Sequence, residues 1–121
     1  MGLRLFIVED HQDIADALSE LLAAEGLCET VGKARTESDA LAWSFHHEAG
    51  FDVAIVDLLL ADGSGFSVLA HLVKYQPGKV VVFSDFVTPV IAERCQRLGA
   101  AAAFQKSRME DCIAYVRALA S

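Results

Sequence analysis

The sequence predicts an α/β fold in which a parallel sheet is covered by helices on both faces. Three observations support this fold class: short apolar runs alternate with longer amphipathic segments, the central runs are apolar at every position, and polar residues follow the runs directly. Strands buried on both faces are typically apolar throughout, and parallel strands need crossover connections, usually helices. A length of 121 residues suits one domain with its own core. We therefore expect a single domain over residues 1–121.

Five segments have the composition of strands. The runs 53–56 and 80–83 contain apolar residues only, which favours central positions in the sheet. The second segment is weaker, and Cys28 and Val31 are its expected inward residues. The expected strands cover residues 3–8, 27–33, 51–56, 80–83 and 101–105.

Apolar residues spaced three or four positions apart predict five helices. Thr36 and Thr88 are expected to cap the second and fourth helices, because a hydroxyl can accept a free N–H of the first turn. Gly26 and Gly99 are expected to end the first and fourth. The expected helices cover residues 13–25, 36–48, 66–76, 88–98 and 109–119. Their expected buried stripes include Leu21, Leu41, Phe45, Leu69 and Val73, and Trp43 is expected to pack near the second stripe.

Polar side chains follow four of the expected strands. Glu9 and Asp10 come after the first strand, Asp57 after the third, Ser84 after the fourth and Lys106 after the fifth. The carboxyl ends of parallel strands meet at one edge of a sheet, so we expect these side chains to lie close together. Three neighbouring carboxylates repel one another unless a cation is present, and Mg²⁺ prefers such oxygen ligands. The set therefore predicts Mg²⁺-assisted transfer of a phosphoryl group onto a carboxylate.

These motifs, in this order, resemble the receiver domain of two-component response regulators, and the resemblance covers essentially the whole chain. It implies a flavodoxin-like, doubly wound sheet with the strand order 2-1-3-4-5. The motifs that carry it are Val8-Glu9-Asp10-His11, the segment Asp-Leu-Leu-Leu-Ala-Asp-Gly-Ser-Gly at 57–65, Val82-Phe83-Ser84, and the segment from Gly99-Ala100 to Lys106-Ser107.

The resemblance implies a phosphoacceptor and a metal site. Asp57 would take a phosphoryl group from the phosphohistidine of a histidine kinase or a histidine phosphotransfer protein. Asp10 and Asp57 would bind Mg²⁺ directly, and Glu9 would bind it through water. The backbone carbonyl of Leu59 would be a further ligand.

The resemblance also implies how the phosphoryl group is held and read. The Ser84 hydroxyl would donate a hydrogen bond to a phosphoryl oxygen. Lys106 would pair with Asp57 before phosphorylation and with the phosphoryl group afterwards. The output would be phosphorylation-dependent binding of a downstream protein, through the fourth helix, the fifth strand and the fifth helix. Such a domain is a phosphoacceptor switch rather than an enzyme.

Three positions depart from the family pattern: Ala61 stands where Pro is common, which should loosen the loop slightly without abolishing activity, and the other two bear on signalling. Ala103 stands three residues before Lys106, where receivers usually carry a Tyr or Phe that acts as a rotating switch. The neighbouring Phe104 is expected to point to the other face of the sheet. Asp85 stands where receivers usually have a small residue beside the phosphorylation site. We expect Asp85 either to point into water or to shorten the life of the phosphorylated form.

Four alternatives remain beside a stand-alone receiver. Ala103 and Asp85 are compatible with a degenerate receiver that binds proteins without phosphorylation, and the chain could also be the N-terminal fragment of a longer regulator. A phosphohydrolase with Asp57 as its nucleophile typically needs a second Asp two residues later, but Leu59 is found there. A flavin-binding protein is disfavoured because the acidic loop at 9–13 repels phosphate.

Charge and composition narrow the partners and the compartment. A formal net charge of -7 argues against direct binding to nucleic acid, and no apolar run has the roughly 20 residues of a membrane helix. No segment resembles a signal peptide. The cysteines are isolated and odd in number, which predicts buried thiols in a reducing cytoplasm. They are Cys28, Cys95 and Cys112.

Overall fold

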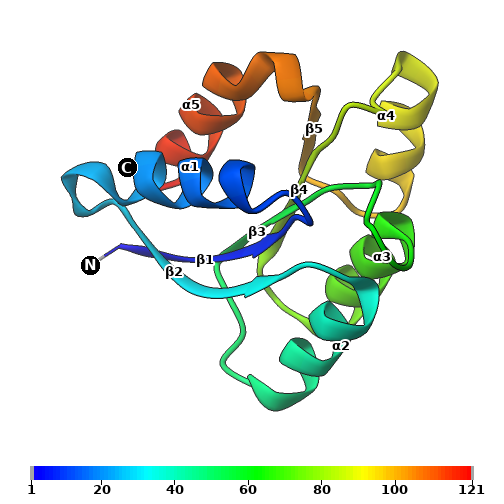
Figure 1. Ribbon diagram of the computed structural model, residues 1–121, viewed down its shortest axis with the longest axis horizontal. Coiled ribbons are helices and arrows are strands. Elements are labelled where there is room, and N and C mark those ends of the chain that lie inside the picture. Colours follow the sequence, from blue (N-terminus) through cyan, green and yellow to red (C-terminus); the bar gives the residue numbers. More distant parts are fainter. Residues whose placement is uncertain (1, 121) are drawn as a thin grey trace.

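The computed structural model describes residues 2–120, which form five parallel strands and five α-helices in strict alternation (Figure 1). The strand order is β2-β1-β3-β4-β5, so the expected flavodoxin-like topology is confirmed. The strands are β1 (Leu3–Val8), β2 (Cys28–Ala34), β3 (Val53–Val56), β4 (Lys79–Phe83) and β5 (Ala102–Phe104). The helices are α1 (Gln12–Ala23), α2 (Glu37–His46), α3 (Gly65–Tyr75), α4 (Pro89–Arg97) and α5 (Met109–Ala120).

Two hydrophobic cores lie on the two faces of the sheet. Helices α1 and α5 cover one face, and α2, α3 and α4 cover the other (Figure 1). Successive strand residues alternate between the cores: Phe6 packs under α2, whereas Ile7 packs under α1 and α5. All four residues of β3 are buried, as a central strand requires. The sheet is therefore held from both sides, and side chains reach solvent mainly at its ends.

The second helix lies differently on the sheet than its apolar pattern predicts. Phe45 is 73% exposed rather than buried, and the buried positions of α2 are Ala40 and Ser44. These small residues let the helix approach the sheet closely. Trp43 provides the aromatic contact instead, because its ring stacks on Phe6 with 4.0 Å between centroids. The expectation for Phe45 was wrong, and that for Trp43 is confirmed.

Two further apolar positions are more exposed than expected. Leu21 of α1 is 44% exposed, and its neighbours Leu18 and Leu22 fill the core. Val73 of α3 is 36% exposed, and Leu72 is fully buried in its place. In each helix the chain offers more apolar residues than the buried stripe can hold, so spacing alone does not identify the inward ones.

Both predicted hydroxyl caps are present. The Thr36 hydroxyl accepts the backbone N–H of Asp39 at 3.1 Å, and the Thr88 hydroxyl accepts that of Ile91 at 3.2 Å. Gly99 ends α4 with φ at 104°, a conformation that favours glycine. These caps fix where the two helices begin relative to the strands that precede them.

Some element ends differ from the expected ranges. Helix α1 stops at Ala23 and continues as a 3-10 turn to Gly26, where φ is 70°. The third strand begins at Val53 rather than at residue 51. The side chain of Asp52, rather than a backbone carbonyl, accepts the N–H of Arg4 at 2.7 Å. Regular pairing of β3 with β1 therefore starts at the next residue of each strand, with Val53 opposite Leu5.

The turn between β3 and α3 is fixed by very close packing. Gly65 donates its N–H to the Leu58 carbonyl at 3.1 Å, and a Cβ at position 65 would lie 2.0 Å from the Asp57 carbonyl oxygen. Gly63 has φ at 90° and packs against Glu37 of α2. The expectation that glycines shape this turn is confirmed. The first turn of α3 can approach the end of β3 because position 65 has no side chain.

We expect Gly65→Ala to lower the free energy of unfolding by about 1–3 kcal/mol, because the new methyl group overlaps backbone atoms that cannot move away. Ser67→Ala, at an exposed position of the same helix, is the matched control and should change stability by less than about 0.5 kcal/mol. Urea unfolding of the three proteins measures both values. Equal stability of the wild type and Gly65→Ala would contradict the close packing.

Candidate functional site

The predicted polar residues meet at the carboxyl edge of the sheet, and backbone pairing fixes their positions. Asp57 donates its N–H to the Val8 carbonyl at 2.9 Å, and Ser84 donates its N–H to the Phe104 carbonyl at 3.0 Å. Glu9 is bonded to β2 in the same way. Each residue therefore continues the ladder one step beyond its strand, so its side chain projects from a rigid backbone.

A buried ion pair links three of these residues. Lys106 Nζ lies 2.7 Å from Asp57 Oδ2 and 2.6 Å from Glu9 Oε1. The Lys106 side chain is 10% exposed, and both carboxylates are 3% exposed. The expected pairing of Lys106 with Asp57 is present. The contact with Glu9 was not predicted, and it places one ammonium between two carboxylates.

Asp57 is held in its ionised form although it is buried. Burial raises the pKa of Asp57, but hydrogen bonds from Lys106, from the Ser84 hydroxyl and from the Leu59 N–H outweigh it and hold the pKa below its ordinary value. The Leu59 N–H lies 3.1 Å from Asp57 Oδ1. An ionised carboxylate is the form that can act as a nucleophile or bind a cation.

The pKa of Glu9 is shifted in the opposite direction, above its ordinary value. Burial raises the pKa of Glu9 to about 7, against the lowering effect of its hydrogen bond with Lys106. The neighbouring Asp57 carboxylate raises it further. Glu9 therefore binds a proton more readily than an ordinary carboxyl group, whereas Asp57 binds one less readily.

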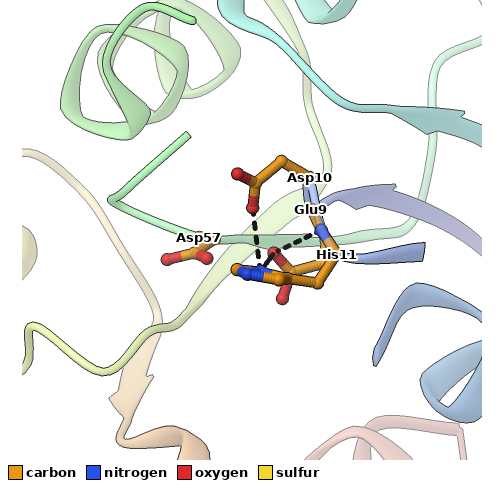
Figure 2. A group of neighbouring side chains, drawn as sticks. All are labelled: Glu9, Asp10, His11 and Asp57. Carbon is orange, nitrogen blue, oxygen red and sulfur yellow. Dashed lines mark hydrogen bonds and ion pairs between the residues drawn. The ribbon is translucent and has the colours of Figure 1, made fainter. Parts of the chain in front are cut away.

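The outer side of the cluster carries Asp10 and His11 (Figure 2). The His11 Nδ1 atom lies 3.1 Å from Asp10 Oδ1 and 3.5 Å from Glu9 Oε2. Asp10 Oδ1 is buried, and apart from the His11 ring nitrogen it has no polar partner within residues 2–120. One ligand atom from each of Glu9, Asp10, His11 and Asp57 falls within a group no more than 4.8 Å across.

This donor set fits a divalent cation. Three carboxylates against the single Lys106 ammonium leave two negative charges uncompensated when all are ionised. The buried Asp10 oxygen, whose one polar neighbour within residues 2–120 is the ring nitrogen of the exposed His11, would be satisfied by a bound cation. Carboxylate oxygens suit Mg²⁺, and the open side leaves room for the waters that Mg²⁺ retains.

The two residues that depart from the family pattern and bear on signalling lie apart from this cluster. Ala103 packs on the α4 side of the sheet, and Phe104 packs on the other side, with its ring 5.7 Å from that of Tyr115. The expected direction of Phe104 is therefore confirmed. Asp85 is exposed, and within residues 2–120 it makes no ion pair with Lys106 or any other group.

Besides the contact of Lys106 with Glu9, sequence reasoning missed two features of the site. His11 belongs to the cluster by position, which could have been found by counting every possible metal ligand directly after the first strand. The Gln105 side chain donates to the Val87 carbonyl at 2.8 Å and ties β5 to the loop before α4. No pattern in the chain indicates this second contact, because it joins two loops.

The parallel α/β fold, with acids and one lysine at the carboxyl edge of its sheet, is the arrangement expected of a receiver domain. The sequence model of the response regulator receiver domain matches residues 5–117. The chain therefore belongs to the response regulator receiver family, which serves two-component systems. The predicted resemblance is confirmed at the level of the family.

Known relatives include regulators of gene expression. The chain is 33% identical over 99 residues to the uncharacterized transcriptional regulatory protein YvfU of Bacillus subtilis, covering 81% of this chain and 48% of that protein. It is 31% identical over 97 residues to the transcriptional regulatory protein DesR of Bacillus subtilis, covering 80% of this chain and 47% of the relative. The chain thus spans about half the length of these relatives. The expectations of a stand-alone receiver and of no contact with nucleic acid stay predictions.

Solved structures agree in fold. A DNA-binding response regulator of the LuxR family from Staphylococcus aureus has a TM-score of 0.83 at 22% identity, over 98% of this chain and 99% of the other. The Francisella response regulator 1452 receiver domain has a TM-score of 0.83 at 19% identity, over 98% of this chain and 97% of the other.

In residues 2–120, no helix has the length and apolar character needed to span a membrane.

Metal-free protein should lose stability as pH rises, because of Glu9. Its pKa is about 7 in the folded chain against 4.5 as the ordinary value, so the folded state binds the proton more tightly. This contribution is complete below about pH 4.5 and is lost as pH approaches about 7, by on the order of 3 kcal/mol at most. The other buried groups shift outside this window: Asp57 below 3.8 and Lys106 above 10.5.

Urea unfolding in a chelator at about pH 5 and about pH 8, for wild type and Glu9→Gln, measures the effect. We expect the wild type to lose more stability than Glu9→Gln across this interval. His71, whose pKa is lowered by burial, contributes equally to both proteins and cancels in the difference. A parallel pH dependence in the two proteins would contradict the assignment to Glu9.

Proposed function

We propose that this chain is a phosphorylation-controlled switch whose phosphoacceptor is Asp57. The single observation that carries the proposal is the buried, ionised Asp57 carboxylate, bound by Lys106 at 2.7 Å beside two further acids. Membership of the receiver family supports it. The donor is a phosphohistidine of a histidine kinase or a histidine phosphotransfer protein.

In the transfer, an Asp57 oxygen attacks phosphorus in line with the departing imidazole nitrogen. The new O–P bond forms as the P–N bond breaks, and the imidazole leaves with the bonding electron pair. The products are an aspartyl phosphate on this chain and a free histidine on the donor. Mg²⁺, when bound, reduces the charge repulsion between the carboxylate and the phosphoryl oxygens.

We assign the metal ligands as the resemblance implies. Asp10 and Asp57 bind Mg²⁺ directly, Glu9 binds it through water, and the Leu59 carbonyl is a further ligand. The supporting geometry is that Glu9 uses Oε1 for Lys106 and turns Oε2 toward the outer side, where Asp10 lies. Metal binding by Glu9 requires loss of its proton, so the metal also sets the charge state of the cluster.

Ser84 and Lys106 hold the phosphoryl group after transfer. Ser84 is fully buried, donates its hydroxyl to Asp57 and accepts the Phe86 N–H at 3.3 Å. Turning this hydroxyl toward a phosphoryl oxygen would break the contact with Asp57 and change the start of the loop before α4. After transfer, the Lys106 ammonium binds the negatively charged phosphoryl group in place of the Asp57 carboxylate and keeps its contact with Glu9.

The output is binding of a downstream protein at the surface formed by α4, β5 and α5, and phosphorylation acts by shifting a pre-existing equilibrium. Val90 of α4 is 75% exposed, and a hollow of about 520 Å³ lies beside Ala103. Alanine has no rotamer to change, so the signal passes through the backbone of the β4–α4 loop. Gln105, bonded to the Val87 carbonyl, links this loop to β5.

We place the domain in the cytoplasm, where its three free, buried cysteines stay reduced.

Incubation with acetyl phosphate and Mg²⁺, followed by intact-mass analysis, tests the proposal. We expect a gain of about one phosphoryl group in the wild type and none in Asp57→Ala or in a chelator. Ser67→Ala, an exposed position of α3, is the matched control and should gain the group normally.

A second function remains open because Ala103 lacks the aromatic side chain that receivers usually have. If no phosphoryl group is gained, and beryllofluoride leaves the NMR spectrum of the protein unchanged, the domain is a phosphorylation-independent interaction module. In that case its binding to a partner should be equal in the wild type and Asp57→Ala.

We expect Asp85→Ala to lengthen the life of the phosphorylated form, because it removes a negative charge next to Ser84 and the phosphoryl group. The exposure of Asp85 limits the effect to a fewfold change, since solvent screens its charge. The rate of phosphoryl loss at low and high salt measures it, with Glu93→Ala on exposed α4 as the control. An unchanged rate in Asp85→Ala would show that this side chain only faces water.

A further inference from the structure

We propose that His11 is a nitrogen ligand of the metal site, so that this receiver prefers transition-metal ions over Mg²⁺ more than an all-oxygen site would. The inference rests on the proposed function, because it concerns the same metal. The expected ligand set included only oxygen atoms from Glu9, Asp10, Asp57 and Leu59. His11 follows the acid pair directly in the chain.

The position of the His11 ring fits a shared ion. Two ligands at about 2.1 Å from one metal and at a right angle are about 3.0 Å apart. The His11 Nδ1 atom is 3.1 Å from Asp10 Oδ1. The separation of Nδ1 from Glu9 Oε2 is 3.5 Å, which corresponds to a wider angle about the same ion. Figure 2 shows the ring directed at both carboxylates.

The acids leave oxygen atoms on the side where His11 lies. Lys106 binds Glu9 Oε1 and Asp57 Oδ2. The second oxygens accept one backbone N–H each, that of His11 at 3.4 Å on Glu9 Oε2 and that of Leu59 at 3.1 Å on Asp57 Oδ1, and each keeps a further lone pair for an ion. Asp10 Oδ1 is buried, and His11 Nδ1 is its one polar neighbour within the described chain. Opposite ligands of one ion are about 4.2 Å apart, and the four ligand atoms already lie within 4.8 Å. Small side-chain adjustments therefore bring all four to one ion.

The chemical class of the ion follows from the nitrogen donor. Imidazole binds Zn²⁺, Co²⁺, Ni²⁺ and Cu²⁺ well, whereas Mg²⁺ prefers oxygen and keeps several waters. His11 is 65% exposed, so its ring stands at the mouth of the site and can be replaced by water when Mg²⁺ is bound. The residue should thus change the choice of metal more than the ability to bind one.

Titration calorimetry with Mg²⁺ and with Co²⁺ tests this on wild type, His11→Ala and the control His46→Ala, an exposed histidine on α2. We expect His11→Ala to weaken Co²⁺ binding by about tenfold or more and to change Mg²⁺ binding by less than about threefold. His46→Ala should leave both unchanged. Equal changes for both metals in His11→Ala, or none, would overturn the proposal.

A structural readout is independent of activity. A histidine ring bonded to Co²⁺ has its N–H proton signal shifted far outside the ordinary NMR range, and the chain has four histidines. We expect one such shifted ring N–H signal in the wild type and in His46→Ala, and none in His11→Ala. Persistence of the shifted signal in His11→Ala, or its absence from the wild type with Co²⁺ bound, would contradict the assignment.

Failure of this inference and failure of the proposed function give different results. Phosphorylation with acetyl phosphate and Mg²⁺ should proceed in His11→Ala, because the oxygen ligands remain. Unchanged metal selectivity in His11→Ala, together with normal phosphorylation, overturns only the role of His11. Absence of phosphorylation in the wild type overturns the function, and the Co²⁺ measurements still decide whether His11 binds metal.

Discussion

The site depends on one buried ammonium. Lys106 bridges Asp57 and Glu9 at 2.7 and 2.6 Å in surroundings that exclude most solvent. Without it, two buried carboxylates would face each other, and protonation would remove the nucleophile. Because the cation sits on the inner side of both acids, the outer side stays negative and open. The same contact therefore keeps Asp57 reactive and leaves a place for a metal ion.

The rigidity of the surrounding backbone makes this arrangement possible. The site residues extend strands that are packed from both sides, and the β3–α3 turn is fixed to α2 as well. Ser64 donates its N–H to the Glu37 carboxylate at 2.8 Å, and the Glu37 N–H is bound by the Asp62 carbonyl at 3.1 Å. By contrast, the loop before α4 is held by few contacts, chiefly Ser84 with Phe86 and Gln105 with Val87. The β3–α3 turn beside Asp57 is thus tied down by more contacts than the loop before α4, through which we propose that the signal passes.

The sequence predicts the fold and the members of the site well. The spacing of apolar residues and the positions at which strands end can both be read from short stretches of the chain. The alternation of apolar runs gives the five β–α units, and the polar residues after them give Glu9, Asp57, Ser84 and Lys106. It predicts less well which apolar residue of a helix faces inward. Phe45 is exposed because Ala40 and Ser44 set the distance of α2 from the sheet, and that distance depends on Trp43, Phe6 and Gly32 together. The place of His11 likewise depends on the direction of a loop rather than on spacing.

The single tryptophan of the chain has a consequence for how the protein can be observed. Trp43 is stacked between Phe6 and His47, with ring centroids 4.0 and 4.3 Å away, in the half of α2 that runs away from the carboxyl edge. The fluorescence of Trp43 therefore reports how α2 packs on the sheet and does not report phosphorylation at Asp57. An optical signal for the chemistry needs a dye elsewhere. The position of Phe86, 44% exposed and bonded to Ser84, is the natural attachment point.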